Sequence, residues 1–362
     1  MTRYQDIQEC LKEHPRTWLV TGVAGFIGSH LLEQLLRLNQ RVVGLDNFAT
    51  GSKRNLVNVE ARVGREAFTH FRFLEGDIRD PAVCASATIG IEFVLHQAAL
   101  ASVPRSMADP LNTHTTNVDG FVNMLLAART AGVRRLVYAS SSSVYGDDTS
   151  DLKVEGKIGR PLSPYATSKL MNEIYADTLR RTHGIESIGL RYFNVFGPRQ
   201  DPHGAYAAVI PRWTELLAAG KPCLVFGDGS ASRDFCFVDN VVQANLLAAC
   251  VAEADSAGGV FNVAYGARTT LLELFGAIRQ RVAAVRPNAA GRELQVEPIR
   301  AGDIPHSLAN VQLARDILGY LPAYDLARGL DQTVPWYAKR ASRSSVGTTS
   351  TAQAVHSDQE AR

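Results

Sequence analysis

The stretch Thr21-Gly22-Val23-Ala24-Gly25-Phe26-Ile27-Gly28 decides the fold of this chain. It follows the apolar run Trp18 to Val20 and precedes an amphipathic stretch, so a strand, a tight turn and a helix are predicted in that order. The spacing G-x-x-G-x-x-G lets the turn direct backbone N–H groups at a pyrophosphate, at the positive end of the helix. A tight strand–helix connection without a ligand is the alternative explanation. The candidate dinucleotide-binding residues of this turn are Gly22, Gly25, Phe26, Ile27 and Gly28.

Strands and helices alternate along the first half of the chain. Short apolar runs at Val42 to Leu45, Phe93 to Leu95 and Leu136 to Ala139 are expected to be buried parallel strands, with amphipathic stretches between them. This alternation predicts an α/β fold with a Rossmann-type, doubly wound parallel sheet. We expect the dinucleotide-binding domain to span residues 16–193, with residues 238–265 returning to it.

Loops rich in proline and glycine begin at about Asn194, as in Gly197-Pro198 and Gly227-Asp228-Gly229. They indicate a smaller C-terminal α/β domain that binds the substrate, formed by residues 194–237 and 266–340. Residues 341–362 are too polar to bury much surface, so this tail is predicted to be disordered.

The overall composition limits the classes of function. The 362 residues carry a net charge of only +2, with scattered lysine and arginine, which argues against a nucleic-acid partner. No apolar run approaches the roughly 20 residues of a membrane span, so no membrane partner is expected. Five cysteines without a C-x-x-C pair favour a reducing, cytoplasmic location. The nine histidines form no metal-binding pattern, so no metal site is predicted.

Two carboxylates follow predicted strands at the cofactor edge of the sheet. Asp46 ends the second strand, 18 residues after Gly28. There it can accept both hydroxyls of an adenosine ribose and repel the extra phosphate of NADP, so NAD is the expected cofactor. Asp77 follows the third strand, where the adenine would lie, but a turn residue or helix cap is an equally good explanation for it.

A second motif, Tyr165-Ala166-Thr167-Ser168-Lys169, supplies the predicted chemistry. Ser163 and Pro164 before it are typical of an N-cap and a first helical turn. Tyr165 and Lys169 then share one helix face, where the ammonium group is expected to lower the pKa of the phenol. Such a tyrosine can act as a general base. An exposed tyrosine over a lysine is the alternative, but the run Ser140 to Ser143 should face the same cleft.

Taken in order, these motifs resemble those of the extended short-chain dehydrogenase/reductase family, over residues 16–337. Further motifs that carry the resemblance are Leu45 to Asn47, His96 to Ala99, Ser141 to Gly146, Leu190 to Gly197, Ser232 to Phe235 and Arg300 to Asp303. Within the family the chain is similar to the nucleotide-sugar 4-epimerases. The resemblance implies tightly bound NAD, and a homodimer formed through helices near residues 117–131 and 164–181.

The resemblance assigns expected roles residue by residue. Tyr165 matches the family's catalytic base, Lys169 its partner on the nicotinamide ribose, and Ser141 the group that bonds the reacting sugar hydroxyl. Ser142 is placed with these catalytic residues. The other expected cofactor residues are Asn47, Ile78, Gln97, Ala98, Ala99, Asn117 and Tyr192. The expected substrate residues are Ser102, Ser141, Ser142, Ser143, Asn194, Gln200, Val209, Arg233, Arg300, Asp303 and Ser307.

The resemblance also implies the reaction, which is 4-epimerisation through a transient 4-keto sugar. Tyr165, directly or through Ser141, takes the proton of the 4-hydroxyl while NAD accepts hydride from carbon 4 and later returns it to the other face. Binding through the nucleotide diphosphate, with Arg233 and Arg300 on its oxygens, lets the sugar turn without leaving. A non-catalytic NAD-sensing protein is the alternative from another class, and it would need neither Tyr165 nor Lys169.

Related dehydratases and uronate decarboxylases have carboxylates where this chain has Ser142 and Ser143, so 4,6-dehydration and decarboxylation are less favoured. Among the epimerases, the resemblance is to bacterial UDP-N-acetylglucosamine 4-epimerases of O-antigen (lipopolysaccharide) and capsule synthesis. It runs through Ala101 to Ser106, Arg199 to Pro202, Gly204 to Pro211 and His306 to Ala309.

Ser307 stands where some glucose-specific relatives carry a bulky tyrosine, and its small side chain leaves room for a 2-acetamido group. Ser142 and Gln200 could hydrogen-bond that group. The expected reaction therefore interconverts UDP-N-acetylglucosamine and UDP-N-acetylgalactosamine. UDP-glucose is an alternative substrate, as is a uronic acid form whose carboxylate could pair with Arg105 or Lys157.

Overall fold

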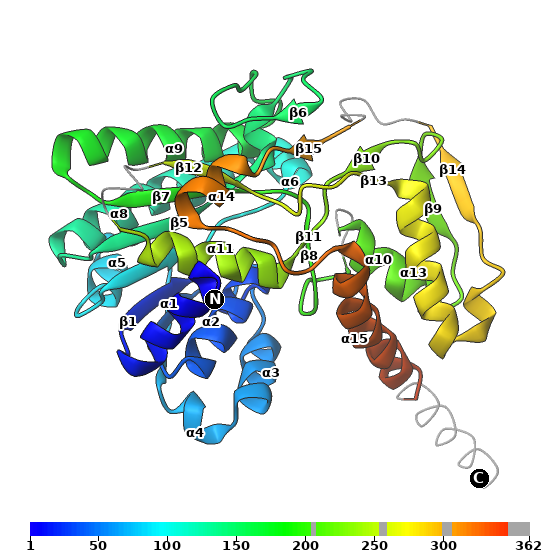
Figure 1. Cartoon of the computed structure of the whole chain (residues 1–362), viewed down its shortest axis with the longest axis horizontal. Helices are drawn as coiled ribbons and strands as arrows, with labels where there is room; N and C mark the ends of the chain where they lie inside the picture. The colour runs from blue at the N-terminus through cyan, green and yellow to red at the C-terminus, as the bar shows by residue number, and fades with distance from the viewer. Residues whose placement is uncertain (204–207, 253–258, 299–305, 347–362) are drawn as a thin grey trace, which may run out of the picture. The chain divides into compact units, whose positions relative to one another are not determined.

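A computed structural model describes residues 1–203, 208–252, 259–298 and 306–346. The chain divides into two compact units, whose elements are labelled in Figure 1. The first unit contains Met1–Val195, Arg233–Arg268 and His306–Asp325. The second contains Phe196–Ser232, Thr269–Pro305 and Leu326–Arg362. Expected site residues Arg300 and Asp303 lie outside the described residues.

A seven-stranded parallel sheet forms the centre of the first unit, with the order β12-β7-β5-β4-β1-β2-β3. The strands are β1 (Thr17–Thr21), β2 (Arg41–Asp46), β3 (Phe71–Glu75), β4 (Phe93–His96), β5 (Arg135–Ser141), β7 (Ser187–Tyr192) and β12 (Val260–Val263). The central strands are buried along most of their length, which explains their continuous apolar runs. This is the Rossmann-type sheet predicted from the sequence, and its strand order reverses between β1 and β4.

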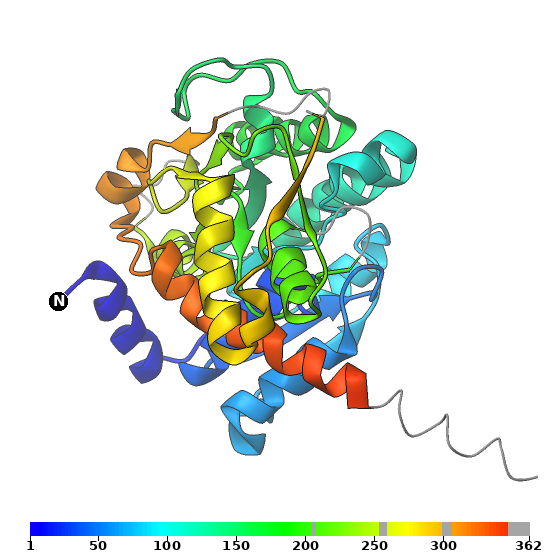
Figure 2. The ribbon, with the colours of Figure 1, turned by 90° about the vertical axis from the view of Figure 1, so that its right-hand side faces the viewer.

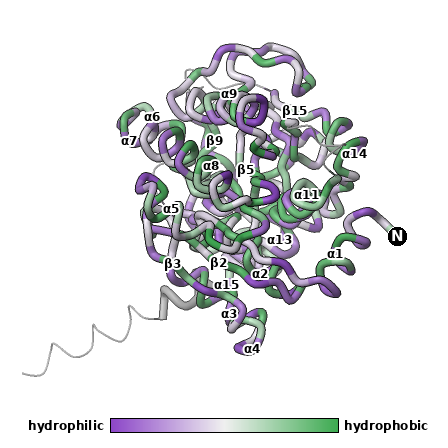
Figure 3. The backbone as a smooth tube through the Cα atoms, turned by 90° about the vertical axis from the view of Figure 1, so that its left-hand side faces the viewer, coloured by the Kyte–Doolittle hydropathy of each residue, from purple (hydrophilic) through white to green (hydrophobic). Residues whose placement is uncertain are grey.

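Helices cover the sheet, and two hydrophobic clusters fill the space beneath them. One cluster includes leucines of α2 and α11, and the other includes Phe121 and Leu125 of α8 and Ala176 of α9. Figure 3, coloured by hydropathy, lets the reader follow the apolar runs through the interior. The helices are α1 (Arg3–Glu13), α2 (Phe26–Arg37), α3 (Lys53–Val63), α4 (Arg65–Phe68), α5 (Pro81–Ala87), α6 (Val103–Ala108), α7 (Pro110–His114), the π-helix η1 (Thr115–Asp119), α8 (Gly120–Thr130), the 3-10 helix η2 (Ser142–Tyr145), α9 (Pro164–His183), α11 (Val238–Cys250) and α14 (Gln312–Leu318).

Residues 238–265 supply α11 and β12 to the first unit. Two further segments belong to this unit, although the sequence placed them elsewhere. Residues 306–325 were expected in the second domain, but β15 (Leu308–Ala309) pairs with β6 (Leu152–Lys153), and the buried Tyr320 donates a hydrogen bond to the Ala264 carbonyl. Helix α1 precedes the expected domain boundary at residue 16, and its Leu11 is buried in the main core.

The second unit is smaller and contains both helices and strands. Helices α10 (Val209–Ala218), α13 (Leu271–Val285) and α15 (Leu326–Val346) pack against one another, as Figure 2 shows. Trp213 and Phe275 meet edge to face between α10 and α13. The second unit also contains β9 (Cys223–Phe226), which pairs in parallel with β14 (Leu294–Glu297), together with η3 (Pro287–Ala289) and the two-residue strand β13 (Thr269–Thr270). The short strands β8 (Val195–Phe196) and β10 (Ser232–Arg233) cross the boundary between the two units, and β11 (Cys236–Phe237) belongs to the first.

Helix α15 corrects the predicted start of the tail. The sequence predicted a disordered tail from residue 341 onward, but the helix continues to Val346. Val334 and Tyr337 are fully buried and anchor the helix, and each further residue then costs little because propagation is easier than nucleation. None of the helices in the described ranges is both long and apolar enough to cross a membrane.

The glycine turn depends on a close approach between α2 and the end of β1. Gly22 adopts a φ of +65°, and a β-carbon there would lie 2.8 Å from the Ala98 backbone nitrogen. A β-carbon at Gly28, on α2, would overlap the carbonyl oxygen of Gly22. Both glycines are therefore required for the turn to close, whether or not a ligand is bound.

Replacement of Gly28 by alanine should therefore destabilise the fold. Backbone, rather than a flexible side chain, meets the added methyl group, so we expect a loss of about 1–3 kcal/mol in the free energy of unfolding. Urea denaturation measures it. Gly276→Ala in α13 is the matched control, since no atom lies within 4 Å of a β-carbon there and alanine favours a helix. Equal stability of Gly28→Ala and wild type would contradict this account of the turn.

Candidate active site

The glycine turn leaves the start of α2 open to an anion. Gly25 is the N-cap of α2, and it contributes no side-chain cap. The Gly25 N–H donates to the Gly22 carbonyl, which closes the turn. The first helical residues, Phe26 and Ile27, therefore present their N–H groups at the positive end of the helix, where a pyrophosphate is stabilised. These residues fit the phosphates of NAD.

Asp46 braces the same turn from the end of β2. Its carboxylate accepts hydrogen bonds from the Ala24 N–H at 2.9 Å and the Phe48 N–H at 2.7 Å. Burial raises the pKa of Asp46, and the two backbone donors oppose that shift. Each carboxylate oxygen keeps a second lone pair, so the group that orders the turn can also accept ribose hydroxyls.

Asp77 takes the turn role that the sequence left open, and it does so beside the cofactor edge. Its carboxylate accepts the Arg79 N–H, which closes a local turn, and forms an ion pair with the Arg79 guanidinium at 2.7 Å. Asn47 donates to the same carboxylate at 2.8 Å. The hydrogen bond from Arg79 is the main cause that lowers the pKa of Asp77, to about 2. Ile78 is buried, and a β-carbon at Gly120 would meet its side chain.

The residues after β4 lie against the glycine turn. The Gln97 N–H donates to the Thr21 carbonyl, and the Ala98 N–H donates to the Thr21 hydroxyl. The Gln97 side chain accepts a hydrogen bond from Tyr192 and donates to Asn245, which in turn donates to Tyr192. Tyr192, expected to contact the cofactor, is thus held in a closed triangle of side chains.

Asn117 has a structural role in this arrangement. Its carboxamide accepts from the Leu100 N–H at 2.8 Å and donates to the Leu100 carbonyl and to Ser168. The residue lies in the π-helix η1, a type of irregularity that is frequent at functional sites. Asn117 therefore joins the loop after β4 to helix α9, next to the expected cofactor residue Ala99.

Helix α9 begins as the sequence predicts. Ser163 is its N-cap and accepts a hydrogen bond from the Ala166 N–H, with Pro164 in the first turn. The Tyr165 N–H, which no residue inside the helix can accept, donates to the Ser106 hydroxyl at 3.1 Å. The Tyr165 side chain comes close to the Ser141 side chain, at the end of β5, and Ser141 acts to lower the pKa of the phenol. The expected base and the expected hydroxyl residue are thus neighbours.

The direction of the Tyr165 pKa differs from the expectation. Burial raises the pKa of the phenol, and the nearby Ser141 side chain only opposes that shift. The sequence predicted a pKa lowered by Lys169, but the Lys169 ammonium group donates to the Ala139 carbonyl at 2.8 Å. Loss of hydration of the phenolate therefore outweighs the neighbouring charge in the chain alone.

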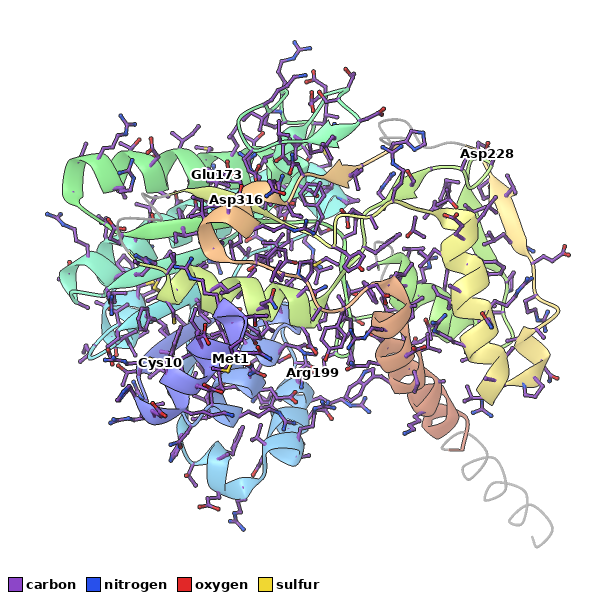
Figure 4. All side chains as sticks on the ribbon, in the orientation of Figure 1. Met1, Cys10, Glu173, Arg199, Asp228 and Asp316 are labelled. Atoms are coloured by element: carbon purple, nitrogen blue, oxygen red, sulfur yellow. The ribbon has the colours of Figure 1, made fainter. Side chains whose placement is uncertain are left out.

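Lys169 is itself buried, with 3% of its surface exposed. Burial lowers the pKa of its ammonium group to about 8, and the negative charge of Glu173 opposes the shift. Glu173, labelled on α9 in Figure 4, accepts two hydrogen bonds from the Arg191 guanidinium, at 2.9 and 2.8 Å, and one from Ser140. Burial and, to a smaller extent, the positive charge of Lys169 lower the pKa of His96 to about 3. His96 is therefore neutral, and its ring forms a hydrogen bond with the Thr21 hydroxyl.

The serine run passes from the end of β5 into a short 3-10 helix: Ser140 and Ser141 end the strand, and Ser142 and Ser143 begin η2. Ser141 caps η2 by accepting from the Ser143 N–H at 3.1 Å, and the Ser143 hydroxyl donates to Ser141 at 2.9 Å. Ser141, Ser142 and Ser143 are all partly exposed. A chain of hydroxyls therefore leads from Tyr165 to the surface. Ser102 caps α6 by accepting from the Arg105 N–H.

The expected diphosphate and sugar residues are distributed over both units. Asn194 and Arg233 belong to the first, where Asn194 is exposed and adopts a φ of +32°, which is unusual for a residue other than glycine. Its side chain donates to the Asp234 carbonyl at 3.0 Å. Gln200 and Val209 belong to the second unit. Ser307, partly buried, comes directly before β15 in the first unit.

Several residues of the site were not predicted. Ser106 orients the start of α9, the Ala139 carbonyl accepts from Lys169, and Glu173 joins Lys169 to Arg191. Glu173 carried a signal, because Tyr165, Lys169 and Glu173 repeat every four residues on one helix face. Ser106 and Ala139 carried none, since their roles depend on contacts between distant segments. Within the described residues, no cluster of potential ligands could hold a metal ion.

Comparison with known proteins agrees with this geometry. The model of the NAD dependent epimerase/dehydratase family matches residues 18–264. A UDP-glucose 4-epimerase of Mycolicibacterium smegmatis is 39% identical over 324 residues, which cover 89% of this chain and 98% of that protein.

Two solved structures are also similar. The UDP-N-acetylglucosamine 4-epimerase from Methanobrevibacter ruminantium, in complex with UDP-N-acetylmuramic acid, is 33% identical with a TM-score of 0.81, over 90% of this chain and 99% of that one. The UDP-glucose 4-epimerase of Thermus thermophilus, in complex with NAD, is 34% identical with a TM-score of 0.75, over 89% and 98%. Because the family match spans the glycine turn, the serine run and helix α9, this chain belongs to the NAD dependent epimerase/dehydratase family, within the extended short-chain dehydrogenase/reductases.

Proposed function

We propose that this chain interconverts UDP-N-acetylglucosamine and UDP-N-acetylgalactosamine by inverting carbon 4 of the sugar. The broader assignment, an NAD-dependent UDP-sugar 4-epimerase and hence an isomerase, rests on the family and on relatives that match nearly the whole chain. The observation that carries the chemistry is the placement of the Tyr165 side chain beside Ser141, one helical turn from the buried Lys169.

Each group at the site has a role in this reaction. Bound NAD supplies the acceptor and donor of hydride at carbon 4. Tyr165 takes the proton of the 4-hydroxyl, and Ser141 holds that hydroxyl in line with the phenol. Lys169 provides the positive charge that favours the phenolate once a ligand has displaced water. The chain of hydroxyls through Ser143 offers the proton a route toward solvent.

Dehydration and decarboxylation are disfavoured by the groups around η2. Elimination of water needs an acid and a base near carbons 5 and 6 of the sugar. The helix η2 contains no carboxylate: it offers the hydroxyls of Ser142 and Ser143, while that of the buried Tyr145 is bonded to Asn262. The next carboxylates, Asp147 and Asp148, form ion pairs with Arg160 and with the buried Lys153. They are therefore occupied in holding the loop that follows η2.

The preference for an acetamido sugar is supported by Ser307. A small, partly buried side chain directly before β15 leaves volume that a tyrosine would fill. A uronic acid is less well supported, because Lys157 donates to Ser150 at 2.6 Å and lies 3.5 Å from Asp148. Its charge is already balanced within the loop.

The proposal includes a homodimer and a cytoplasmic enzyme that serves surface-polysaccharide synthesis. Exposed apolar side chains on α8 and α9, among them Leu126, Ile174 and Tyr175, could be covered by a second copy. All five cysteines are free thiols, as in proteins of reducing compartments.

A kinetic comparison of substrates tests the proposal. The purified protein, without added NAD, should convert UDP-N-acetylglucosamine into its 4-epimer with a higher kcat/KM than it converts UDP-glucose, as followed by NMR. Greater efficiency with UDP-glucose or with UDP-N-acetylglucosaminuronic acid would overturn the proposed substrate preference, but it would leave the mechanism of 4-epimerisation unchanged. Release of a 4-keto-6-deoxy or shortened sugar would overturn the epimerase assignment.

Enlarging Ser307 should reverse the preference. In Ser307→Tyr, we expect kcat/KM for the acetamido sugar to fall at least about tenfold, since roughly 1.4 kcal/mol of binding is lost when the pocket is filled. Turnover of UDP-glucose should change little. Ser307→Ala is the matched control and should keep both activities. Equal losses for the two sugars in Ser307→Tyr would show that this position does not contact the acetamido group.

Removal of the Tyr165 hydroxyl should abolish most turnover. A positioned general base contributes about 10²- to 10⁴-fold, so kcat of Tyr165→Phe should fall by that factor while KM changes little. Tyr175→Phe, an exposed position on the same helix, serves as the control. A kcat of Tyr165→Phe within threefold of wild type, on the order of 0.6 kcal/mol, would exclude Tyr165 as the base.

The charge of Lys169 should control the pH dependence. Removing a buried cation disfavours the phenolate, so the pKa of Tyr165 rises further in Lys169→Met. The rising limb of the kcat profile should then move to higher pH by about 1–3 units, with activity partly recovered in alkali. Profiles of wild type and variant in the same buffers measure the shift. A uniform loss at every pH would contradict this role.

A further inference from the structure

Asn262 is a fully buried polar residue on β12, the edge strand of the sheet. A carboxamide in the interior is costly unless its atoms are hydrogen-bonded, and all of those of Asn262 are. Its Oδ1 accepts from the Tyr145 hydroxyl at 2.7 Å, and its Nδ2 donates to the carbonyls of Lys153 and Asn310, each at 3.0 Å. Because carbonyls only accept, the orientation of the amide is fixed.

The partners of Asn262 come from three segments far apart in the sequence. Tyr145 ends η2, Lys153 lies in β6, and Asn310 directly follows β15. Strands β6 and β15 have only two residues each, which pair Leu308 with Leu152 and Ala309 with Lys153. Such short strands do not hold together by their own ladder. The Asn262 side chain is therefore a main link between the β6–β15 pair and the sheet.

A second contact reinforces this link. The Asn262 N–H, on the edge of the sheet, donates to the Glu155 carboxylate at 2.8 Å. Arg191, the neighbour of Asn262 across the β12–β7 pair, donates to the Glu155 carbonyl at 3.0 Å and lies over the Tyr145 ring. The loop after η2 is thus fixed to the strand that carries Asn262 at both its side chain and its backbone.

The two ends of this network adjoin the two parts of the expected sugar pocket in the first unit. Tyr145 is the last residue of η2, which begins with Ser142 and is capped by Ser141. Ser307 comes directly before β15, whose following residue accepts from Asn262. Asn262 therefore connects the serine run that contacts Tyr165 with the segment that carries Ser307.

We propose that Asn262 is a positioning residue for substrate specificity: it holds the Ser307 segment at a fixed place relative to the serine run. This inference rests on the proposed function, since it concerns the fit of the 2-acetamido group. Loss of the amide removes one of the contacts that hold β15 in place. It impairs binding of the larger sugar more than that of UDP-glucose, which makes no contact through an acetamido group.

The experiment measures the Kd of UDP-N-acetylglucosamine and of UDP-glucose by calorimetry, together with thermal stability. In Asn262→Leu, the ratio of the two Kd values should shift against the acetamido sugar by about fivefold, the effect of one lost hydrogen bond of about 1 kcal/mol. Tyr145→Phe removes only the link to η2, and should shift the ratio in the same direction by a smaller factor.

Asn240→Leu is the matched control. Asn240 is also buried, lies in the same unit, and makes three hydrogen bonds, to the Tyr324 carbonyl and from the N–H groups of Ala323 and Tyr324. This variant should lose thermal stability without any change in the Kd ratio.

If the folded Asn262→Leu variant binds both UDP-sugars more weakly by the same factor, Asn262 has only a structural role and the inference is overturned. If that variant does not fold, an unchanged ratio in folded Tyr145→Phe overturns it equally. Failure of the proposed function has a different signature, because it shows in the wild type as a preference for UDP-glucose. A ratio that shifts in Asn262→Leu supports the positioning role whichever sugar the wild type prefers.

Discussion

One buried positive charge, the ammonium group of Lys169, connects the sheet to the catalytic helix. A charge removed from water is costly, and here it is balanced by the Ala139 carbonyl at 2.8 Å and by Glu173 one helical turn further along. Glu173 is itself fixed by Arg191 on β7 and by Ser140 on β5. Helix α9 cannot turn or slide against these strands without leaving a buried charge unpaired, so the position of Tyr165 follows from the packing of the sheet.

This arrangement explains how Tyr165 can be a neutral phenol in the chain alone and still act as a base once a ligand is bound. In the chain alone, burial favours the neutral phenol of Tyr165, and the Ser141 hydroxyl gives it a partner. The cation that would favour the phenolate is already in place and already desolvated, so little reorganisation is needed when a ligand excludes water. The glycine turn and Asp46 lie at the carboxyl ends of β1 and β2, on the same edge of the sheet. The order of strands reverses nearby, between β1 and β4.

Local pattern was enough to predict the parallel sheet, the glycine turn and the start of α9 at Ser163, because each depends on residues that are neighbours in the sequence. It was not enough for contacts between distant segments. Nothing in the periodicity near Leu308 shows that this segment pairs with Leu152, so residues 306–325 were placed in the wrong unit. The same reason hid Asn262, whose partners lie from 48 to 117 residues away. The predicted direction of the Tyr165 pKa shift was wrong, because desolvation depends on packing that the sequence does not display.

The central claim is that carbon 4 is oxidised and reduced within one closed cycle, on an acetamido sugar. Its most direct test uses UDP-N-acetylglucosamine labelled with deuterium at carbon 4, in unlabelled water and without added NAD. The account predicts UDP-N-acetylgalactosamine that retains the deuterium at carbon 4, because the hydrogen never exchanges with solvent while the hydroxyl proton passes through Tyr165. Loss of the label to water, or no conversion of this sugar by a folded protein, would contradict it.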